Sequence, residues 1–193
     1  MGKRIGIFGG SFNPIHNAHI ALGTTMLSAI SLDEVWYMVS PQNPLKQHST
    51  SLINEGIRYR LTALALRDHP RLVASDYEFS LPRPSYTWDT LQSLSRDYPE
   101  HQFVLIIGGD NWAAFNHWAH HDDIIRHYEI AIYPRSGSEI SAESLPQNVT
   151  IVPFPEVNIS STQIREMISQ GEDITPYVPP QVANEVEKCA LYR

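Results

Sequence analysis

The amino-acid sequence predicts an α/β protein with a doubly wound, mostly parallel sheet. The main observation is a regular alternation along the 193 residues, in which short apolar runs are followed by segments of helical periodicity. The second is composition: 42% hydrophobic and 18% charged residues suit one globular domain spanning residues 1–193. The third is the position of four unusual polar stretches, each directly after a predicted strand. Together they predict helices on both faces of one sheet.

In the first half of the chain, strands and helices alternate from the N-terminus. IGIF is a buried first strand, and apolar residues at helical spacing follow it. The expected elements are a strand Ile5 to Phe8, a helix Ile20 to Ile30, a strand Glu34 to Val39, a helix around 57–65, and a short strand Leu72 to Ala74 with Tyr77 to Leu81 as its pairing partner.

The second half continues the same alternation. Leu91, Leu94 and Tyr98 mark a helix that ends before Pro99, and FVLIIG is the most apolar strand. The later elements are strands Phe103 to Gly108, Glu129 to Tyr133 and Val149 to Phe154, and helices Ser161 to Ile168 and Gln181 to Cys189, which make a small C-terminal helical segment. Residues 134–146 are expected to form a polar loop.

The charge balance argues against nucleic acid as a partner. There are 14 Lys and Arg residues against 21 Asp and Glu residues, for a net charge of -7, whereas nucleic-acid binders usually carry the opposite balance. A small anionic ligand stays open, because a few local cations can hold one. Cys189 is the single cysteine, which excludes an intramolecular disulfide and suits a reducing compartment.

No targeting or membrane segment is expected. The apolar run after Lys3 and Arg4 is too short for a signal peptide, and no stretch approaches the roughly 20 apolar residues of a membrane span. The sequence therefore predicts a cytoplasmic protein without a membrane partner. It leaves the choice between monomer and homo-oligomer open.

The four polar stretches are expected to lie at one edge of the sheet. They are Gly6 to Ile20, Ser40 to Lys46, Gly108 to Trp112 and Asn158 to Arg165, each at the end of a predicted strand. In doubly wound sheets, ligands bind beyond the carboxyl ends of the strands. This agreement predicts a single ligand site built from all four.

The first turn carries glycines and histidines directly behind the first strand. Gly9 and Gly10 allow a sharp bend and close approach to a ligand, and the N–H groups that follow can cradle a phosphate. A dinucleotide-binding fingerprint is the obvious alternative, but it needs G-x-G-x-x-G and an acidic residue ending the second strand. The chain has G-I-F-G-G-S-F there, and Val39 and Ser40 at the strand end, which disfavours a Rossmann dehydrogenase.

His16 and His19 are three residues apart, a spacing that places them on one face of a helix. Each imidazole can donate a hydrogen bond to a phosphate oxygen. The alternatives are a surface histidine beside a packed one, and a zinc site, for which the H-E-x-x-H spacing and a cysteine cluster are missing. Directly behind Gly-Gly-Ser-Phe-Asn-Pro, the pair favours phosphate binding.

A second polar stretch follows the last predicted strand. Ser160, Ser161 and Thr162 can cap a helix and leave N–H groups and hydroxyls facing an anion. Arg165 is one turn further on, where its guanidinium can grip a polyphosphate. The alternative is an ordinary helix cap followed by a surface arginine.

These two stretches resemble the signatures of nucleotidyltransferases that transfer AMP from ATP. GGSFNPIHNAHI resembles Gly-Gly-Thr/Ser-Phe-Asp/Asn-Pro-x-His-x-Gly-His, with Asn13 where Asp is frequent and Ala18 in place of the usual Gly. ISSTQIR, from Ile159 to Arg165, resembles their second signature, a Ser- and Thr-rich helix start that ends in Arg. The resemblance implies a Rossmann-like nucleotidyltransferase fold and Mg²⁺ bound mainly through the ATP phosphates.

Three further stretches resemble one family of this group, the nicotinate-nucleotide adenylyltransferases of bacterial type. RPSYTWDTL resembles their Pro-Ser-Tyr-Thr-x-x-Thr-Leu, IIGGDNW their Ile-Ile-Gly-x-Asp segment, and VSPQNPLK their proline-rich loop with a lysine. The resemblance covers Gly6 to Arg165, and the terminal Leu191-Tyr192-Arg193 also resembles the corresponding residues of this family. It implies that ATP and nicotinate mononucleotide are the substrates, and that deamido-NAD and pyrophosphate are the products.

The resemblance implies roles at matching positions. His16, His19 and Arg165 are the expected catalytic residues, which would hold phosphates while the mononucleotide 5′-phosphate attacks the α-phosphorus in line. Backbone N–H groups near Thr87 and Trp118 would hold the nicotinate carboxylate. The residues expected to bind ATP are Gly9, Gly10, Ser11, Phe12, Lys46, Gly108, Asp110, Arg135, Ser160, Ser161 and Thr162. Those expected to bind nicotinate mononucleotide are Ser11, Tyr86, Thr87 and Trp118, the last by stacking on the pyridine ring.

Other functions stay open at this point. Nicotinamide mononucleotide or phosphopantetheine can be the acceptor in related enzymes, although the phosphopantetheine enzymes usually have Thr at the position of His16. A catalytically silent nucleotide sensor on the same fold, and a metal hydrolase built on the two histidines, belong to other classes. Asp110, expected to accept hydrogen bonds from a ribose, has a plainer alternative as the cap of a helix at Trp112.

Overall fold

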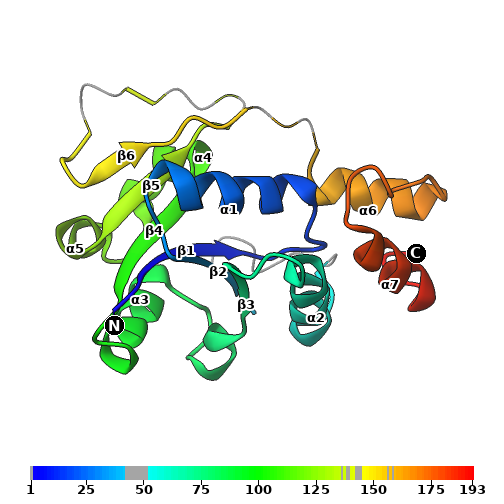
Figure 1. The fold of residues 1–193 in the computed structure, drawn as a ribbon, viewed down its shortest axis with the longest axis horizontal. Helices are drawn as coiled ribbons and strands as arrows, with labels where there is room; N and C mark the ends of the chain where they lie inside the picture. The colour runs from blue at the N-terminus through cyan, green and yellow to red at the C-terminus, as the bar shows by residue number, and fades with distance from the viewer. Residues whose placement is uncertain are drawn as a thin grey trace.

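A computed structural model of the chain describes residues 2–41, 52–135, 137, 140–141, 145–155, 157 and 159–193. Its middle layer is a six-stranded sheet (Figure 1). The strands are β1 (Arg4–Gly10), β2 (Glu34–Val39), β3 (Leu72–Ser75), β4 (Gln102–Gly108), β5 (Glu129–Tyr133) and β6 (Val149–Ile151). Neighbouring strands pair in parallel, in the order β3-β2-β1-β4-β5-β6. The expected parallel sheet is confirmed.

The sheet grows outward from β1 in both directions. The chain first adds β2 and β3 on one side of β1, and then returns to add β4, β5 and β6 on the other side. The strand order therefore reverses between β1 and β4. A crevice opens at such a switch point, beyond the carboxyl ends of the strands, so the residues after β1 and β4 are the best placed to bind a ligand.

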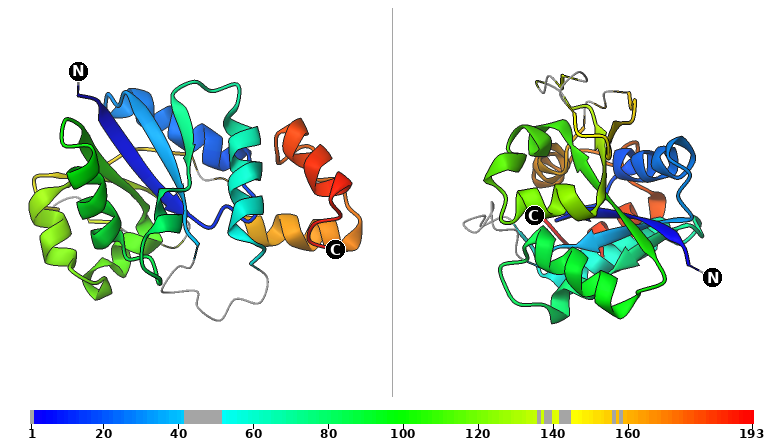
Figure 2. Two further views of the ribbon diagram at one scale, coloured as in Figure 1. Left: turned by 90° about the horizontal axis from the view of Figure 1, so that it is seen from below. Right: turned by 90° about the vertical axis from the view of Figure 1, so that its left-hand side faces the viewer.

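Helices cover both faces of the sheet, as expected from the alternating pattern (Figure 2). Helix α1 packs on one face and α3 on the opposite face. The helices are α1 (Asn17–Ala29), α2 (Glu55–Leu66), α3 (Thr87–Asp97), α4 (Gly109–Ala113), α5 (His121–His127), α6 (Ser161–Gln170) and α7 (Pro180–Lys188), with short 3₁₀ helices η2 (Tyr77–Ser80) and η3 (Phe115–His117). In the described part of the chain, no helix is both long enough and apolar enough to cross a membrane.

The core consists of two apolar clusters, one on each face of the sheet. In β4, Leu105 and Ile107 belong to the cluster that includes α3, whereas Val104 and Ile106 belong to the cluster that includes α1. Successive residues of a strand point to opposite faces, so a strand buried on both faces needs an unbroken apolar run. This requirement explains why FVLIIG was recognisable as a strand.

The C-terminal helices pack against the N-terminal part of the fold. Figure 1 shows α6 and α7 beside the start of α1 and beside α2. Ile164 of α6 and Val182 of α7 are fully buried, and they belong to the same cluster as Phe12 and Ile15, which follow β1. Apolar packing thus brings the end of the chain against its first turn.

Two predicted strands differ from the structure. Tyr77 to Leu81 is not a strand but the 3₁₀ helix η2, and β3 pairs with β2 instead. In Tyr77 to Leu81 the alternating apolar and polar residues resemble the pattern of a strand. The Phe79 N–H, however, donates to Asp76 O at 2.8 Å, which closes a tight turn. β6 ends at Ile151 and not at Phe154, because Pro153 has no N–H with which to continue the ladder.

Candidate active site

Residues 11–16 connect β1 to α1 without helix or strand. Phe12 has φ 43°, an uncommon left-handed conformation, and its ring is buried beside His19. Its side chain is therefore part of the core, and its backbone alone can reach ATP. A Cβ on Gly10 would lie 2.8 Å from that ring, so glycine is required there. A Cβ on Gly9 would meet no atom within 4 Å, which leaves the backbone open to a ligand.

His16 and His19 meet at the start of α1, but not on one helical face. The helix begins at Asn17, and His16 precedes it with an extended backbone, φ -144° and ψ 171°. The expectation of a shared helical face is therefore wrong. The two rings stack nevertheless, with centroids 3.7 Å apart and planes at 29°. Two imidazoles thus lie at a helix N-terminus, which itself attracts anions.

The backbone determines which nitrogen of His19 carries the hydrogen. The His16 backbone N–H donates to His19 Nδ1 at 3.3 Å. A ring nitrogen that accepts a hydrogen bond carries no proton, so the neutral ring is protonated at Nε2. His19 therefore has a donor on the far side of its ring, as needed to bind a phosphate oxygen.

His16 is neutral at neutral pH. The residue is 5% exposed, and burial, helped by the Arg135 guanidinium, lowers its pKa to about 4. Its Nδ1 is buried and has no hydrogen-bond partner among the described residues. A neutral imidazole avoids the repulsion between two stacked cations, and it can still donate one N–H to a phosphate.

Helix α6 is tied directly to this turn. Arg165 Nη1 donates to Asn13 O at 2.8 Å, and Ser161 Oγ donates to Pro14 O at 2.8 Å. Ser160 is the N-cap residue of the helix. The two stretches expected to bind one anion therefore lie in contact, although 152 positions separate Asn13 from Arg165.

The hydroxyls of this stretch also take part in hydrogen bonds within the protein. Ser161 uses its hydroxyl to hold the turn, Thr162 Oγ1 accepts from Arg165 Nη2 at 3.2 Å, and Ser160 Oγ bonds to Gln163. The guanidinium of Arg165 is the charged group of this stretch that suits an anion. Because it has several N–H donors in a planar fork, it can hold the turn and a phosphate together.

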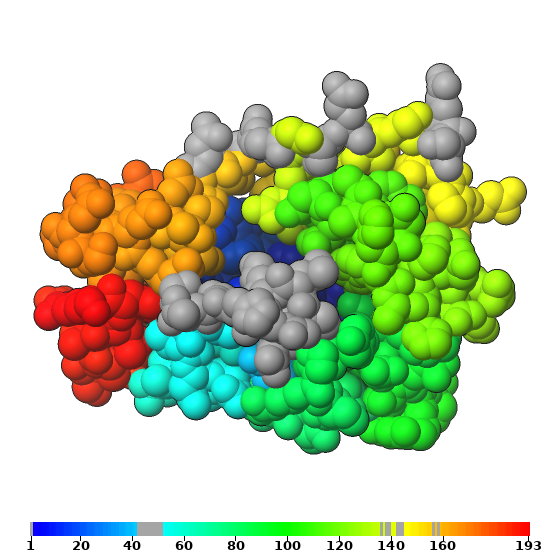
Figure 3. All heavy atoms as spheres, turned by 180° about the vertical axis from the view of Figure 1, so that it is seen from behind, coloured from blue at the N-terminus to red at the C-terminus, as the bar shows by residue number. Residues whose placement is uncertain are grey.

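Figure 3 shows the hollow in which these parts meet. The N-terminal segment (blue) lies at the bottom of a depression between the segment around α6 (orange) and the segment that follows β4 (green). Gly9, Gly10 and Gly108 line a pocket here, so the ends of β1 and β4 both open into it. The stretches after these strands are thus brought together, as their positions in the sequence predicted.

Asp110 and Arg135, two expected ATP contacts, form an ion pair with each other. Arg135 Nη1 lies 3.2 Å from Asp110 Oδ2. Asp110 is not a helix cap, since the N-cap residue of α4 is Gly108. A Cβ on Gly108 would lie 2.5 Å from Asp110 Oδ1 and 2.7 Å from Arg135 Cδ, so glycine makes room for the pair at the end of β4. Lys46 lies outside the described residues.

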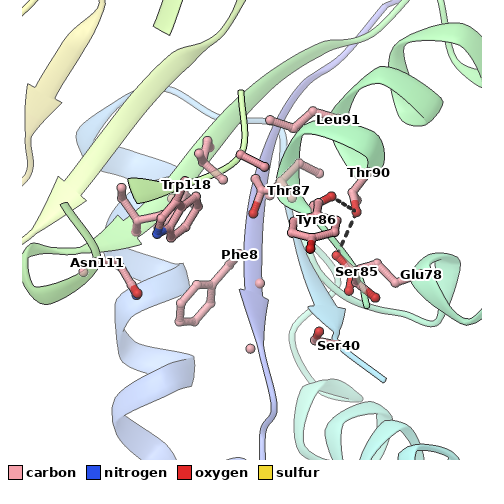
Figure 4. Close-up of a pocket in the computed structure, with 18 of the residues that line it drawn as sticks. Phe8, Ser40, Glu78, Ser85, Tyr86, Thr87, Thr90, Leu91, Asn111 and Trp118 are labelled. Atoms are coloured by element: carbon pink, nitrogen blue, oxygen red, sulfur yellow. Dashed lines mark hydrogen bonds between the residues drawn. The ribbon is translucent and has the colours of Figure 1, made fainter. Parts of the chain in front are cut away.

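The pocket extends from the strand ends to the N-terminus of α3 (Figure 4). Trp118 lies on one side of it, and Tyr86 and Thr87 lie on the other. Thr87 is the first residue of α3, so its N–H has no acceptor within the helix. The backbone N–H of Trp118 donates to Phe115 O at 3.0 Å, so of the two predicted donors the Thr87 N–H is the one without an acceptor in its own element. The pocket offers an aromatic face and a helix N-terminus to a planar anion.

A buried polar cluster on the pocket wall was missed by the sequence analysis. Glu78 Oε1 accepts from the Thr90 hydroxyl at 3.0 Å. Burial raises the pKa of Glu78, against the smaller opposite effect of the hydroxyls of Thr90, Ser40 and Ser85. Within the described residues, Glu78 Oε2 and Ser85 Oγ are buried without a hydrogen-bond partner. Ser85 belongs to the RPSYT stretch, which the sequence analysis recognised. Glu78 lies in the segment that was wrongly predicted as a strand, and nothing in that segment indicated a buried carboxyl group.

Arg58 was missed as well. It is fully buried, and its Nη1 donates to Ser11 O at 2.6 Å and to Ser40 O at 2.9 Å. It therefore joins the segment after β1 to the end of β2. A signal was present, because Arg58 lies three positions before the buried Leu61, on the apolar face of α2. An arginine there must find acceptors inside the protein.

Comparison with known proteins agrees with these observations. Residues 7–167 match the family model described as cytidylyltransferase-like. A protein of Cytophaga hutchinsonii named "Probable nicotinate-nucleotide adenylyltransferase" is 47% identical over 190 residues, 98% of this chain and 96% of its own. One of the same name from Bacteroides thetaiotaomicron is 47% identical and aligns with 93% of this chain and 88% of its own.

A solved structure of similar fold comes from Plasmodium falciparum. It is the nicotinic acid mononucleotide adenylyltransferase of that organism, complexed with NaAD, and it superposes with a TM-score of 0.83 over 98% of this chain and 97% of that chain. At 21% identity, this likeness establishes the fold, whereas the family model and the bacterial relatives establish the family. The chain therefore belongs to the cytidylyltransferase-like family and, within it, to the group named nicotinate-nucleotide adenylyltransferases.

Proposed function

We propose that this chain transfers the adenylyl group of ATP to nicotinate mononucleotide, which yields deamido-NAD and pyrophosphate. The observation that carries the proposal is the contact of Arg165 with Asn13, because it joins the guanidinium of α6 to the turn that bears His16 and His19. The pocket with Trp118 lies beside this turn, and the relatives bear the name of this activity. A polyphosphate site next to a site for a flat ring suits these two substrates.

The phosphates of ATP would lie across the turn after β1. His19 Nε2 and the neutral His16 would donate to oxygens of the α- and β-phosphates, and Arg165 would bind the β,γ unit. Because no atom lies near the Cα of Gly9 on its side-chain side, a phosphate could approach the backbone closely there. The N-terminus of α1 adds its positive end to the same place.

The transfer is an in-line displacement at phosphorus. An oxygen of the mononucleotide 5′-phosphate bonds to the α-phosphorus of ATP, and the bond from that phosphorus to the bridging oxygen of the β-phosphate breaks. The pair of electrons leaves with pyrophosphate. The attacking phosphate is already deprotonated near neutral pH, so no side chain has to act as a general base. Positioning and stabilisation of charge are the tasks left to the protein.

We also propose that Mg²⁺ enters with ATP. The described residues include no group of three or more His, Cys, Asp or Glu side chains able to hold a metal ion, and the side chains around the turn are imidazoles and guanidiniums. This donor set suits an ion held by phosphate oxygens and water. The bound ion would neutralise charge on the phosphates, while His16, His19 and Arg165 would orient them.

The pyridine ring of the mononucleotide would stack on Trp118. An indole face suits an electron-poor ring, and the Thr87 N–H at the start of α3 would donate to the carboxylate. An amide NH₂ in place of a carboxylate oxygen would meet this N–H as a second donor, which disfavours nicotinamide mononucleotide.

The proposal is tested by an acceptor comparison. Purified protein is incubated with Mg-ATP and, separately, nicotinate mononucleotide, nicotinamide mononucleotide or phosphopantetheine, and released pyrophosphate is measured. We expect the highest kcat/KM with nicotinate mononucleotide. Absence of pyrophosphate with all three acceptors would support a silent nucleotide sensor, and a preference for another acceptor would reassign the substrate.

Replacement of the stacking residue tests the pyridine site. Trp118→Ala removes the aromatic face, so we expect KM for nicotinate mononucleotide to rise about 10-fold or more, because stacking on an aromatic ring contributes on the order of 1–3 kcal/mol per base in comparable sites. KM for ATP should stay nearly constant. Steady-state kinetics with each substrate varied in turn makes the comparison, and equal changes for both substrates would remove Trp118 from the pyridine site.

A further inference from the structure

We propose that Tyr192 positions the phosphate-binding turn for catalysis, through a hydrogen bond to the side chain of Asn13. The proposal rests on the proposed function, because it assigns a role in the same adenylyl transfer. Tyr192 lies beyond the residues 7–167 that the family model matches. It is a positioning residue, since its hydroxyl bonds to the turn itself, and it acts through Asn13 on His16.

The contact links two residues 179 positions apart. The Tyr192 hydroxyl donates to Asn13 Oδ1 at 3.0 Å, and Asn13 is 3% exposed. The backbone of Asn13 is held as well, because its carbonyl oxygen accepts from Arg165 Nη1 at 2.8 Å. Asn13 is thus held at its side chain by Tyr192 and at its backbone by Arg165. His16, the first of the two stacked imidazoles, is three residues further along the same turn.

The turn depends on such support because it has no regular structure. Residues 11–16 belong neither to β1 nor to α1, so no strand ladder or helix fixes their backbone. Hydrogen bonds from distant residues fix it instead: Arg58 donates to Ser11 O and Ser161 donates to Pro14 O. These two bind backbone carbonyls, whereas Tyr192 binds a side chain. Tyr192 therefore sets the rotamer of Asn13.

Tyr192 itself occupies a strained backbone conformation. Its φ of 65° is in the left-handed region, which residues with a side chain seldom adopt. Strain of this kind persists where the surrounding structure holds a residue in place. Here the Leu191 N–H donates to Val186 O at 3.0 Å, and the Tyr192 ring packs against the apolar cluster that includes α1. The fold retains a strained residue whose hydroxyl reaches the catalytic turn.

The phenol is a neutral donor in the neighbourhood of two cations. The guanidiniums of Arg165 and Arg58 lie near it, but burial outweighs them and raises the pKa of Tyr192 far above its ordinary value. The hydroxyl therefore keeps its proton and remains a donor. It holds Asn13 without placing a negative charge beside the groups that bind phosphates.

The kinetic test is Tyr192→Phe, which removes the hydroxyl and keeps the ring. Asn13 then loses a buried partner, and the turn before His16 loosens. We expect kcat to fall about threefold to tenfold, the change that one neutral hydrogen bond can produce. KM for nicotinate mononucleotide should stay within about twofold, because the pyridine pocket is untouched. An unchanged kcat would overturn the proposal.

A double-mutant cycle tests whether Tyr192 acts through Asn13. In an Asn13→Ala background, Tyr192→Phe should change kcat by less than about twofold, because the partner is already gone. Tyr128→Phe is the matched control: it removes a hydroxyl that bonds to Ser95 Oγ at 2.9 Å and should leave kcat unchanged. An equal loss of kcat from Tyr192→Phe in both backgrounds would overturn the proposal.

Hydrogen–deuterium exchange tests the positioning without activity. In Tyr192→Phe, peptides that cover residues 11–17 should exchange faster, and peptides from β4 should exchange as in the wild type. Unchanged exchange at 11–17, or faster exchange throughout the chain, would overturn the proposal. If the wild-type protein releases no pyrophosphate with nicotinate mononucleotide, the proposed function fails, whereas the exchange result still decides whether Tyr192 orders the turn.

Discussion

The surroundings of the two imidazoles determine the tautomer of one ring and the protonation state of the other. His19 accepts at Nδ1 from the His16 N–H, so its donor is Nε2. His16 stays neutral because burial holds its pKa at about 4. The proposed nucleophile is a phosphate that needs no base, so neither imidazole has to change its protonation state. Their task in the proposed reaction is to place donors around phosphorus.

This placement predicts the effect of His19→Ala. A donor that strengthens in the transition state contributes to kcat, so we expect kcat to fall about 100-fold or more, with a much smaller change in the affinity for ATP. Steady-state kinetics and equilibrium ATP binding measure the two quantities. His69→Ala, at a residue between α2 and β3, is the control. Weaker ATP binding with full turnover would contradict the role assigned to His19.

Glu78 gives a prediction for the pH dependence of stability. Its pKa is raised in the folded protein, mainly by burial, so the folded state binds the proton more tightly than the unfolded chain. Its contribution to stability is therefore lost as pH rises above the ordinary value of 4.5. Glu78→Gln is neutral at every pH, and its stability relative to the wild type should increase between about pH 5 and about pH 8.

Urea denaturation of Glu78→Gln and of the wild type at both pH values measures the difference in their free energies of unfolding. Titratable groups that the two proteins share affect both equally, so they cancel in this difference. Glu187→Gln, at an exposed position of α7, is the control and should show no such trend. A constant difference between Glu78→Gln and the wild type across this range would mean that the Glu78 carboxyl titrates as an ordinary one.

The sequence revealed the residues of the site that lie in recognisable stretches, and missed those that act through tertiary contact. Gly9, His19 and Arg165 carry local signals, since glycine, imidazole and guanidinium groups at strand ends and helix starts are typical of phosphate sites. Arg58 and Tyr192 hold the same turn by hydrogen bonds to Ser11 and Asn13. These partners are far away in the sequence, so no local pattern identifies which groups the two residues bind, even though the place of Arg58 on the apolar face of α2 shows that it needs acceptors inside the protein.

Among the elements, helix α1 is the one that positions the histidines. It docks on the sheet where Gly23 lies against Tyr37, and the Tyr37 hydroxyl donates to His19 O at 2.7 Å. A Cβ at position 23 would overlap the fully buried Tyr37 hydroxyl. The glycine therefore sets the distance between helix and sheet, and through it the position of His19.

We accordingly expect Gly23→Ala to lower the free energy of unfolding by about 1–3 kcal/mol, as overpacking of a filled core does. It should also lower kcat, because α1 must shift away from β2. Ser28→Ala, on the exposed side of the same helix, should change stability by no more than about 0.5 kcal/mol. Urea denaturation and the pyrophosphate assay measure both effects, and a fully active, equally stable Gly23→Ala would disprove this docking argument.

The elements were predictable where burial dictates the pattern. Glu34–Val39 and Glu129–Tyr133 have the predicted bounds because each apolar run starts after a glutamate and stops before Ser40 or Pro134. Helix α1 begins three residues before the predicted Ile20, because a histidine precedes it in place of the usual Ser, Thr, Asp or Asn cap. Tyr77–Ser80 was mistaken for a strand because its turn depends on hydrogen bonds and not on apolar periodicity.

In the whole molecule, both ends of the chain share one core. Ile164 is fully buried in the cluster that includes residues of β1 and α1, whereas the four tryptophans, such as Trp36 and Trp118, pack against the cluster on the opposite face. The two clusters are separated by a single sheet, whose strands contribute side chains to both. We therefore expect the chain to unfold as one unit.

Ile164→Ala tests this cooperativity. Truncation of a fully buried isoleucine should lower the free energy of unfolding by about 2–5 kcal/mol. Tryptophan fluorescence, which reports on the far face, and circular dichroism, which reports on all helices, should show the same shifted transition. A fluorescence transition that stays at its wild-type urea concentration would show that the two faces unfold separately.

The hydrogen bonds from Arg165 and Tyr192 to Asn13 also bear on the life of the nascent polypeptide. A ribosome makes the imidazole turn early and its two distant supports late, so a partly made chain holds the turn without the groups that order it. In the proposed function, binding of a nucleotide by the ordered turn then begins only after residue 192 has left the ribosome and packed against Asn13.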